Sequence, residues 1–354
     1  MLSGDASDPK SRFRESAEIT IRDIARALNV SHTTVSRALA DSPRISDKTK
    51  LRVRMAVEQM GYVPSASART MRGMRSSLVG LVIPDVQNDF YATVAKVLAD
   101  ALAARSMHLL LSVTDDNGDR ELSEVRTILE TRPAGIIIVP SASPRPETEA
   151  LLRNIEVVQL IRVHPRFAGN AVLIDDREGI LAATRHLLSY GHKRLGYIGG
   201  DESRSTGRSR LAGFQDALAE HSLTPAAVWL GPPRPEFARH AVTSMMSAKN
   251  RPTGLILGSA ELTLGALQAL RAMRLSWPRD FSVVGYHDPA WFELAEGGIT
   301  TVRLPVEDIA TSAASVLLSH ALSHHADTSD PPAPTEVLFA PTLVLRGSTA
   351  PWVE

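Results

Sequence analysis

The 354-residue chain contains no cysteine, which excludes a disulfide framework and any metal site built on thiolates. It also lacks an apolar run of the roughly 18 residues that a membrane-spanning helix needs. Its first twenty residues are polar and offer no apolar core for a signal peptide, so we expect a cytoplasmic protein without a membrane partner. With 44% hydrophobic and 22% charged residues, the composition is typical of a globular protein, and the length suffices for two or three domains.

Net charge is absent as well, because 39 Lys and Arg balance 39 Asp and Glu. The distribution is nevertheless uneven, since residues 1–77 hold fourteen basic and eight acidic side chains, a net charge of +6. The 25 basic and 31 acidic side chains that follow give the remainder a net charge of −6. A basic N-terminal part on an acidic body favours a polyanionic partner at one end only.

Signature motifs of enzymes are missing too. The sequence has no P-loop, no G-x-S-x-G, no G-x-G-x-x-G opening a helix and no zinc-ligand spacing. The eleven histidines are scattered, and His324 and His325 lie in a polar loop. We therefore expect no enzymatic activity, no cofactor and no metal. An α/β enzyme and a solute-binding protein without a DNA role stay open as alternative classes.

The most informative segment runs from Thr20 to Ala40 and reads TIRDIARALNVSHTTVSRALA. Thr20 and Ser31 are suited to cap two short helices, and Asn29 between them tolerates the left-handed backbone of a sharp turn. Apolar residues recur at helical spacing in both halves: Ile21, Ile24, Ala25 and Leu28, then Val35, Ala38 and Leu39. The segment therefore predicts two helices joined by a tight turn.

The second of these helices carries a row of hydrogen-bonding side chains and little apolar bulk. They are Ser31, His32, Thr33, Thr34, Ser36 and Arg37. A helix in the major groove of DNA presents such a row, with its N-terminal residues on base edges. The alternative is an ordinary helical hairpin with a solvated face.

Three further segments complete the organisation. Residues 1–17 are polar and aperiodic, which indicates a disordered tail. A third helix is expected from a cap at Ser46 to a stop at Gly61, with an apolar side made of Leu51, Val53, Met55, Ala56, Val57 and Met60. Residues 64–77 have the size of a linker, rich in Arg and Met, and their composition permits one or two helical turns.

From residue 78 onward, buried-strand runs alternate with amphipathic helices. The first series covers residues 78–161, and a second series begins with the strand 171–175 and ends with the strand 281–287. A last helix over 306–322 is followed by a polar loop and a final strand at 342–347. This alternation predicts parallel sheets with helices on both faces, arranged as two similar subdomains.

The order of these motifs closely resembles the lactose-repressor/galactose-repressor family over about residues 18–351. The resemblance rests on TIRDIARALNVSHTTVSRALA, GYVPSASARTMR, SSLVGLVIPDVQNDFYATV, ATRHLLSYGHKRLGYIGG, RSTGRSRLAGF, FSVVGYH, ITTVRLPVEDIA and LVLRGSTAP. It implies an all-α helix-turn-helix headpiece and an α/β body of two doubly wound parallel-sheet subdomains, similar to periplasmic binding proteins of type I. It also implies a transcriptional repressor that binds operator DNA as a homodimer and takes a small-molecule effector.

The resemblance divides the chain as follows. We expect the headpiece over residues 18–63, a hinge helix or linker over 64–77 and an effector-binding and dimerisation body over 78–349. Within the body, the first subdomain should comprise about 78–167 and 305–325, and the second about 168–302 and 335–349.

At the DNA end, His32 and Thr33 match positions that select operator bases in the family. Arg37 matches a further base-contacting position, and Arg binds guanine in two-pronged fashion. Thr20, Ser31, Thr34 and Ser36 are expected to cap helices or contact phosphates. In the hinge, Ala68, Arg69, Met71 and Arg72 match the family's minor-groove segment, with Met71 in place of the usual Leu wedge.

In the body, ligands of such folds bind beyond the carboxyl ends of the parallel strands. Asp89, Phe90 and Tyr91 follow the first strand, and the resemblance implies that an aromatic at 90 or 91 stacks on the ligand. Core packing of both rings is the alternative. Arg204, Thr206 and Arg210 match ligand-contacting positions in the second subdomain.

Three positions depart from the family pattern, and each departure removes an acidic or hydrogen-bonding group from the cleft. His287 stands in place of an Asp, Ser259 and Ala260 replace an Asn-Asp pair, and Arg162 stands where an acidic residue is common. Two of these changes add a possible cation, which leads to the hypothesis of an effector more anionic than a plain sugar. Asp288 is expected near the ligand and offers an alternative, because it is placed to replace the missing Asp and restore ordinary sugar binding.

Overall fold

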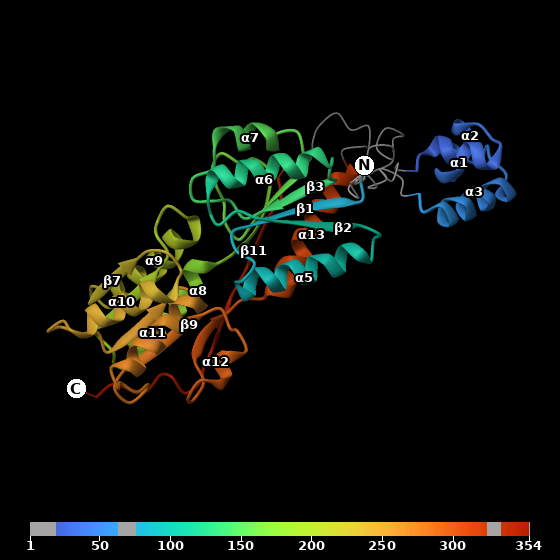
Figure 1. Cartoon of the computed structure of the whole chain (residues 1–354). Coiled ribbons are helices and arrows are strands. Elements are labelled where there is room, and N and C mark those ends of the chain that lie inside the picture. Colours follow the sequence, from blue (N-terminus) through green and yellow to red (C-terminus); the bar gives the residue numbers. More distant parts are fainter. Residues whose placement is uncertain (1–18, 63–75, 324–333, 354) are drawn as a thin grey trace, which may run out of the picture. The chain divides into compact units, whose positions relative to one another are not determined.

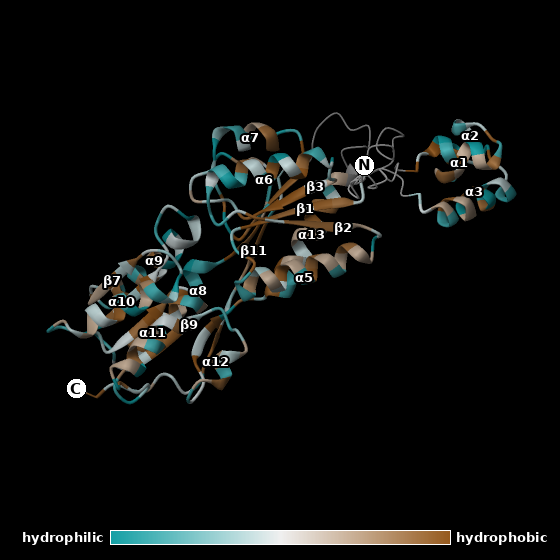
Figure 2. Ribbon diagram, viewed as in Figure 1, coloured by the Kyte–Doolittle hydropathy of each residue, from teal (hydrophilic) through white to brown (hydrophobic). Residues whose placement is uncertain are grey.

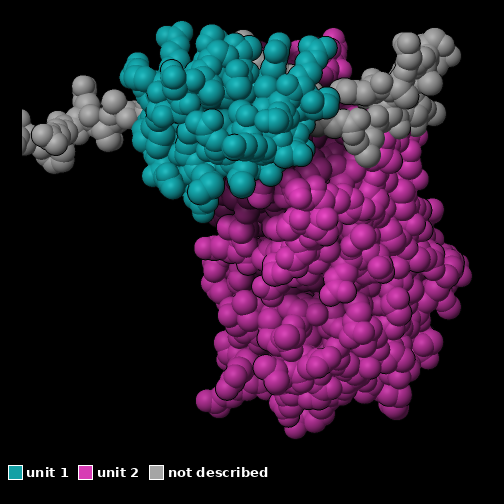
Figure 3. Space-filling model, turned by 90° about the vertical axis from the view of Figure 1, so that its right-hand side faces the viewer, with its two compact units in different colours: residues 1–75 teal, residues 76–354 magenta. Residues whose placement is uncertain are grey.

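The computed structural model describes residues 19–62, 76–323 and 334–353. The chain divides into two compact units, Met1–Arg75 and Ser76–Glu354 (Figure 3). The expected tail over 1–17 lies outside the described residues, and so does the hinge segment with Ala68, Arg69, Met71 and Arg72. The two units are therefore described separately.

The first unit is a three-helix module with α1 (Ile21–Leu28), α2 (His32–Leu39) and α3 (Asp47–Met60). Its small core contains Ile24, Ala25, Val35, Ala38, Val53 and Ala56. The expected third helix is confirmed, because Ser46 caps it and Gly61 ends it with a φ of 66°. The expected apolar side was too wide, since Leu51 and Met55 are 60% and 51% exposed. They lie one turn apart on the side of α3 that faces away from Val53.

The second unit contains two six-stranded sheets, each covered by helices on both faces. The first sheet has the order β11-β5-β4-β3-β1-β2, and all of its strand pairs are parallel. Figure 1 shows α6 and α7 on one face of this sheet and α5 and α13 on the other. Its strands are β1 (Leu78–Ile83), β2 (His108–Val113), β3 (Gly135–Ile138), β4 (Val157–Leu160), β5 (Asn170–Ile174) and β11 (Glu336–Phe339). Its helices are α5 (Asp89–Ala103), α6 (Gly118–Glu130), α7 (Pro146–Leu152) and α13 (Val306–Ser323).

The second sheet has the order β12-β10-β9-β8-β6-β7, and β12 alone runs antiparallel to its neighbour. Helices α8 and α9 pack together, and so do α10 and α11. Its strands are β6 (Leu195–Gly199), β7 (Ala227–Leu230), β8 (Gly254–Leu257), β9 (Ser282–Tyr286), β10 (Thr300–Arg303) and β12 (Thr342–Val344). Its helices are α8 (Asp176–Ser189), α9 (Ser205–Ala219), α10 (Pro235–Met246), α11 (Ala260–Ala272) and the short α12 (Trp291–Leu294).

The chain crosses between the sheets three times, and two of the crossings differ from the expected subdomain boundaries. We expected residues 168–302 and 335–349 in the second subdomain, but β5 and β11 belong to the first sheet. Leu160 of β4 pairs with Val172 of β5, and β5 in turn pairs with β11. Strand pairing therefore moves the first and third crossings to the ends of β5 and β11, whereas the crossing after β10 lies where it was expected. Sequence alternation marks where a strand lies but not which sheet it extends.

The strands carry the core of the body. Figure 2 shows brown, hydrophobic strands and helices that carry both brown and teal residues. Strand β1 has five buried residues out of six, as the apolar run LVGLVI predicts. Because nearly all strands of both sheets are parallel, their carboxyl ends meet at the junction of the two subdomains, where loops and helix N-termini gather.

Candidate functional site

The turn between α1 and α2 has the geometry that its sequence predicts. Asn29 is left-handed, with φ 52° and ψ 49°. Ser31 Oγ accepts a hydrogen bond from the backbone N–H of Thr34 at 3.0 Å and so caps α2. At the start of α1, the backbone N–H and the hydroxyl of Thr20 both donate to the Asp23 carboxylate. Both helix starts are thereby fixed by side chains that the sequence analysis singled out or by their immediate neighbours.

Helix α2 buries one face and exposes the other. Val35 and Ala38 are buried in the module's core, whereas His32, Thr33 and Arg37 are exposed. Within residues 19–62, none of these three exposed side chains has a hydrogen-bond or ion-pair partner. Their donors and acceptors are therefore available to an outside ligand, as reading base edges requires.

A cavity of about 270 Å³ lies between the two subdomains, beyond the carboxyl ends of the parallel strands. Eight of the ten residues expected at an effector site line it: Phe90, Tyr91, Arg162, Arg204, Thr206, Arg210, Ser259 and His287. These residues come from both subdomains and from widely separated parts of the sequence. The cavity is henceforth called the cleft.

Asp89 and Asp288 do not line the cleft. Asp89 is exposed at the first turn of α5 and borders a separate surface groove. Asp288 is 7% exposed, and it pairs with Arg346 at 2.7 Å and with Arg303 at 2.6 Å. Burial raises the pKa of Asp288, but hydrogen bonds from these arginines outweigh it and hold that pKa below its usual value. The alternative in which Asp288 replaces the missing Asp therefore requires breaking two ion pairs.

Arg210 is the most firmly held cation of the cleft. Its Nε donates to Asp176 Oδ1 at 2.8 Å, and its Nη1 donates to the carbonyl oxygen of Gly258 at 2.8 Å. The guanidinium lies 4.0 Å from the centre of the Tyr286 ring. The Tyr286 hydroxyl donates to the same Asp176 oxygen. This network fixes the orientation of Arg210 before any ligand binds.

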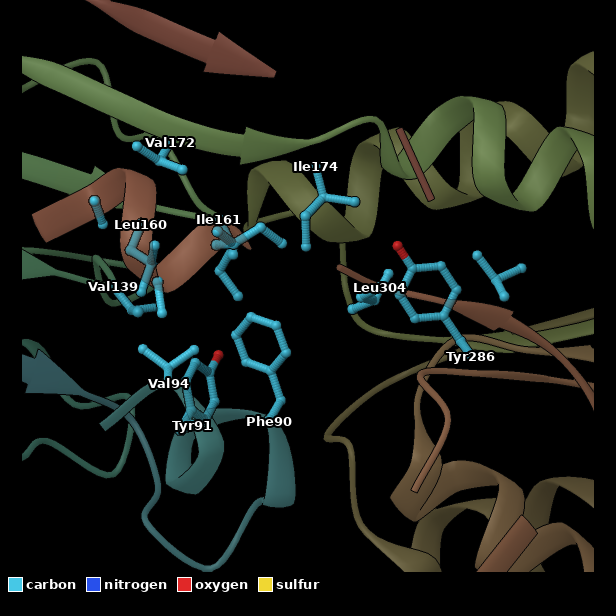
Figure 4. Close-up of a cluster of buried hydrophobic side chains, with 14 of the residues drawn as sticks. Phe90, Tyr91, Val94, Val139, Leu160, Ile161, Val172, Ile174, Tyr286 and Leu304 are labelled. Carbon is cyan, nitrogen blue, oxygen red and sulfur yellow. The ribbon is translucent and has the colours of Figure 1, made fainter. Parts of the chain in front are cut away.

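Aromatic and aliphatic side chains form the apolar part of the cleft. The Phe90 ring packs edge-on against the Tyr91 ring, with 5.3 Å between the ring centres, and against the His287 ring, with 5.8 Å between the centres. Since His287 directly follows β9, α5 of the first subdomain contacts the second subdomain here. Figure 4 shows Phe90 and Tyr286 converging from the two subdomains, with Ile161 and Leu304 nearby. Phe90 and Tyr91 are 5% and 6% exposed and belong to the buried hydrophobic cluster, as the core-packing alternative expects, and each also reaches the wall of the cleft.

His287 differs from the expectation that it adds a positive charge. It is half-buried, and this burial lowers the pKa of its imidazole. The nearby carboxylates of Asp89 and Asp288 oppose this effect only in part. At neutral pH, therefore, His287 contributes a neutral hydrogen-bonding ring to the cleft and the arginines supply its positive charge.

Sequence reasoning missed several cleft residues, of which Asp116 has the strongest contacts. Asp116 follows β2 and accepts hydrogen bonds from Arg162 and Arg204. Asn88 also crosses the cleft, because its Nδ2 donates to Glu261 Oε1 at 2.7 Å. The position of Asp116 just after a strand was a usable signal, since strand ends of the first sheet converge there.

Within residues 19–62, 76–323 and 334–353, no group of three or more His, Cys, Asp or Glu side chains is placed to hold a metal ion. No helix in these ranges is long and apolar enough to cross a membrane.

Comparisons with known proteins agree with this arrangement. Residues 20–65 match the model of bacterial regulatory proteins of the lacI family, and residues 184–349 match a periplasmic binding protein-like domain. The chain is 31% identical to the HTH-type transcriptional regulator GalR of Escherichia coli (strain K12) over 334 residues, which cover 94% of this chain and 96% of that protein. The chain belongs to the lacI family. It is also 30% identical over 336 residues to the HTH-type transcriptional repressor PurR of Edwardsiella ictaluri, covering 94% and 97% of the two chains.

A solved lacI-family structure has the same fold. The crystal structure of the lac repressor dimer bound to operator and the anti-inducer ONPF matches with a TM-score of 0.81, covering 94% of this chain and all of that chain. The sequences are 22% identical, so this likeness concerns the fold alone. The lacI-family fold comprises an N-terminal helix-turn-helix domain and two parallel-sheet α/β subdomains of the periplasmic-binding-protein type, as the sequence predicted.

Proposed function

We propose that this lacI-family chain represses transcription by binding a pseudo-palindromic operator as a homodimer, under the control of a small molecule in the cleft. The observation that carries the proposal is the exposed, unpartnered row of His32, Thr33 and Arg37 on the capped helix α2. A helix that only filled a core would bury or pair these groups. A DNA partner also places the protein's action in the cytoplasm.

At the DNA, His32, Thr33 and Arg37 contact base edges and set the sequence preference of each half-site. Thr20, Ser31, Thr34 and Ser36 cap helices or contact phosphates, which position the module without specifying bases. From the family resemblance, Ala68 and Arg69 lie in a hinge that enters the minor groove, and Met71 wedges between bases beside Arg72. A dimer places two such modules on two half-sites, which explains the symmetry of the operator.

In the cleft, Arg210 and Arg204 bind polar groups of the effector, while Phe90 and Tyr91 contact its ring. Arg162, Thr206, Ser259 and His287 complete the wall. The prepositioned Arg210 supports this assignment, because a rigid cation loses little freedom when the ligand arrives.

Effector and operator are coupled through a shift between two arrangements of the subdomains. A ligand that binds one arrangement more tightly moves the population toward it, and a coupling free energy of about 1–3 kcal/mol is ordinary for such systems. Whether the effector releases DNA or promotes its binding follows from which arrangement it prefers.

Selection from a randomised duplex library with the full-length protein tests the proposal. We expect the selected duplexes to share a pseudo-palindrome and to bind with an affinity that falls steeply as salt rises. Arg37→Ala should relax the preference at one base of each half-site, at a cost of about 1–3 kcal/mol. Recovery of no common sequence, or salt-insensitive binding, would refute the DNA role.

A further inference from the structure

Two arginines from opposite subdomains share one carboxylate at the cleft. Asp116 Oδ1 accepts from Arg162 Nη1 at 3.0 Å, and Asp116 Oδ2 accepts from Arg204 Nε at 2.5 Å. Asp116 and Arg162 follow strands of the first sheet, whereas Arg204 precedes α9 in the second subdomain. The three side chains are only 11–17% exposed, so solvent screens their attraction weakly.

Positive charge exceeds negative charge in this trio. Two guanidinium groups share one carboxylate, and Arg204's second partner, Asp201, is 41% exposed and so better screened by water. The Nε of Arg162 is buried without a hydrogen-bond partner among the described residues. Arg234, which also lines the cleft, has no side-chain hydrogen bond or ion pair in the described part of the chain.

The other carboxylates that line the cleft make no ion pair with Arg162 or Arg204 among the described residues. Asp115 pairs with Arg120 outside the cavity. Glu261 accepts from Asn88 through Oε1, while its buried Oε2 has no hydrogen-bond partner in the described part of the chain. Asp85 accepts the backbone N–H of Gln87 at 2.8 Å. Asp116 is thus the carboxylate that Arg162 and Arg204 share. When it moves away, Arg162 loses its ion-pair partner, and Arg204 keeps only the more exposed Asp201.

We propose that the effector is a monosaccharide-sized anion whose carboxylate or phosphate takes the place of Asp116 on Arg204 and Arg162. This inference rests on the proposed role of the cleft as the effector site. Separating largely buried cations from their partner is strongly unfavourable unless another anion replaces it. A neutral hydroxyl accepts a hydrogen bond without neutralising the charge, whereas carboxylate and phosphate oxygens match the two-pronged geometry of arginine.

The remaining walls set the size and shape of the ligand. A volume of about 270 Å³ is near the lower end for ligand pockets, which suits one sugar ring better than two linked rings. Phe90 gives that ring an apolar surface to pack against, whereas the Tyr286 ring is covered by the Arg210 guanidinium at 4.0 Å. The ligand's charged group then lies toward the arginines.

Replacement of Asp116 by the ligand's anionic group connects ligand binding to the relative position of the two subdomains. Asp116 and Arg204 belong to different subdomains, so displacing Asp116 replaces a direct ion pair with contacts made through the ligand. The hydrogen bonds from Asn88 to Glu261 and from the Val163 N–H to Ser205 Oγ, at 3.1 Å, also cross the cleft. The arrangement preferred with ligand therefore differs from the one that Asp116 holds alone.

Titration calorimetry on the full-length protein tests this inference with matched ligands. The first set is D-galactose, D-galacturonate and D-galactose 1-phosphate, and the second is D-glucose, D-gluconate and D-glucose 6-phosphate. We expect an anionic member to bind at least about tenfold more tightly than its neutral parent, and its affinity to fall with salt. Comparing the affinity of the sugar acid with that of the sugar phosphate shows whether the cleft prefers a carboxylate or a phosphate.

A pair of adjacent variants isolates the role of Asp116, with inorganic phosphate as the minimal probe. Asp116→Asn should raise phosphate affinity about tenfold, because it removes the competing carboxylate from Arg204 and Arg162. Asp115→Asn removes the same charge from the same cavity but frees no cleft arginine, so we expect less than about a threefold change. Arg204→Gln should weaken phosphate binding about tenfold or more.

Two results would overturn the inference: neutral sugars that bind as tightly as every anionic form, or equal phosphate affinities in the Asp116→Asn and Asp115→Asn variants. Thermal unfolding of each variant confirms that it is folded. The calorimetry uses no DNA, so its outcome is separate from the operator selection. If the protein binds anions in the cleft but no operator, the ligand inference stands and the proposed role in transcription is refuted.

Discussion

Single side chains in this protein derive their properties from the partners that surround them. Glu121 on α6 is buried, and its Oε2 accepts the backbone N–H of Ser141 at 2.6 Å while its Oε1 has no hydrogen-bond partner among the described residues. Burial raises the pKa of Glu121 to about 7, and the hydrogen bond from Ser141 offsets this only partly. A glutamate that its sequence places on an ordinary helix thus titrates near neutral pH.

Replacing Glu121 with Gln should remove a pH dependence of stability. Because the folded-state pKa of about 7 lies above the unfolded value of 4.5, the folded protein holds its proton more tightly. The free energy of unfolding therefore falls as pH rises from about 4.5 to about 7, by about 3 kcal/mol for this group. Urea unfolding at pH 5 and pH 8 measures how much the free energy of unfolding falls between these two pH values.

We expect Glu121→Gln to be more stable than the natural chain at pH 8 and to differ little from it at pH 5. The exposed Glu130 on the same helix provides the control, since Glu130→Gln should leave the pH dependence unchanged. Buried histidines titrate in the same range, but they are common to all three proteins and cancel in the differences. An unchanged pH profile in Glu121→Gln would contradict the assignment.

At the scale of elements, helix α2 separates residues that stabilise the module from exposed residues that, in the proposed function, contact DNA. Ser31 caps the helix, and Val35 and Ala38 pack into the core. Thr33 lies on the exposed face without a partner in the headpiece. One short helix thus supplies both the fixed orientation and the free polar groups that groove binding needs.

The contrast between Ser31 and Thr33 can be measured. Ser31→Ala removes the cap on the Thr34 N–H and should lower the stability of the three-helix module by about 1 kcal/mol. Thr33→Ala should leave that stability within about 0.5 kcal/mol but weaken operator binding. Hydrogen exchange of α1–α3 amides reports the stability, and fluorescence anisotropy on a selected operator reports the binding. Equal stability losses in both variants would count against this separation.

At the scale of the whole molecule, the second subdomain exposes apolar side chains that its own core leaves uncovered. Leu264 on α11 and Leu294 on α12 are 38% and 85% exposed, and both border one shallow pocket with Trp277. A homodimer is part of the proposed function, and a second copy of the chain is the partner that buries such a face without an additional protein.

We expect the full-length protein to sediment as a dimer of 38.3 kDa chains and the Leu264→Asp variant to sediment as a monomer. The inserted charge would be desolvated at the interface, which is costly without a partner. Val228, 37% exposed at the edge strand β7, supplies the matched control, because Val228→Asp should stay dimeric. A Leu264→Asp protein that remains a dimer would place the interface elsewhere.

Much of this protein is determined by local pattern in the sequence. The caps at Ser31 and Ser46, the left-handed turn at Asn29 and the helix end at Gly61 follow from residue types whose preferences act within a few positions. The alternation of strands and helices likewise predicted two parallel-sheet subdomains, because hydrophobic periodicity is a local property. The place of the cleft follows from the rule that ligands bind beyond strand ends, whereas its expected lining residues came from the family resemblance.

The tertiary structure alone decided which distant residues meet. It assigned β5 and β11 to the first sheet, turned Asp288 toward Arg346, and brought Asp116 between Arg162 and Arg204. Strand pairing, burial and charge neutralisation depend on three-dimensional distance, which residue spacing along the chain does not encode. The sequence by itself therefore determined the family, the helix-turn-helix pair and the presence of a cleft, while the fold decided which charges in the cleft are paired.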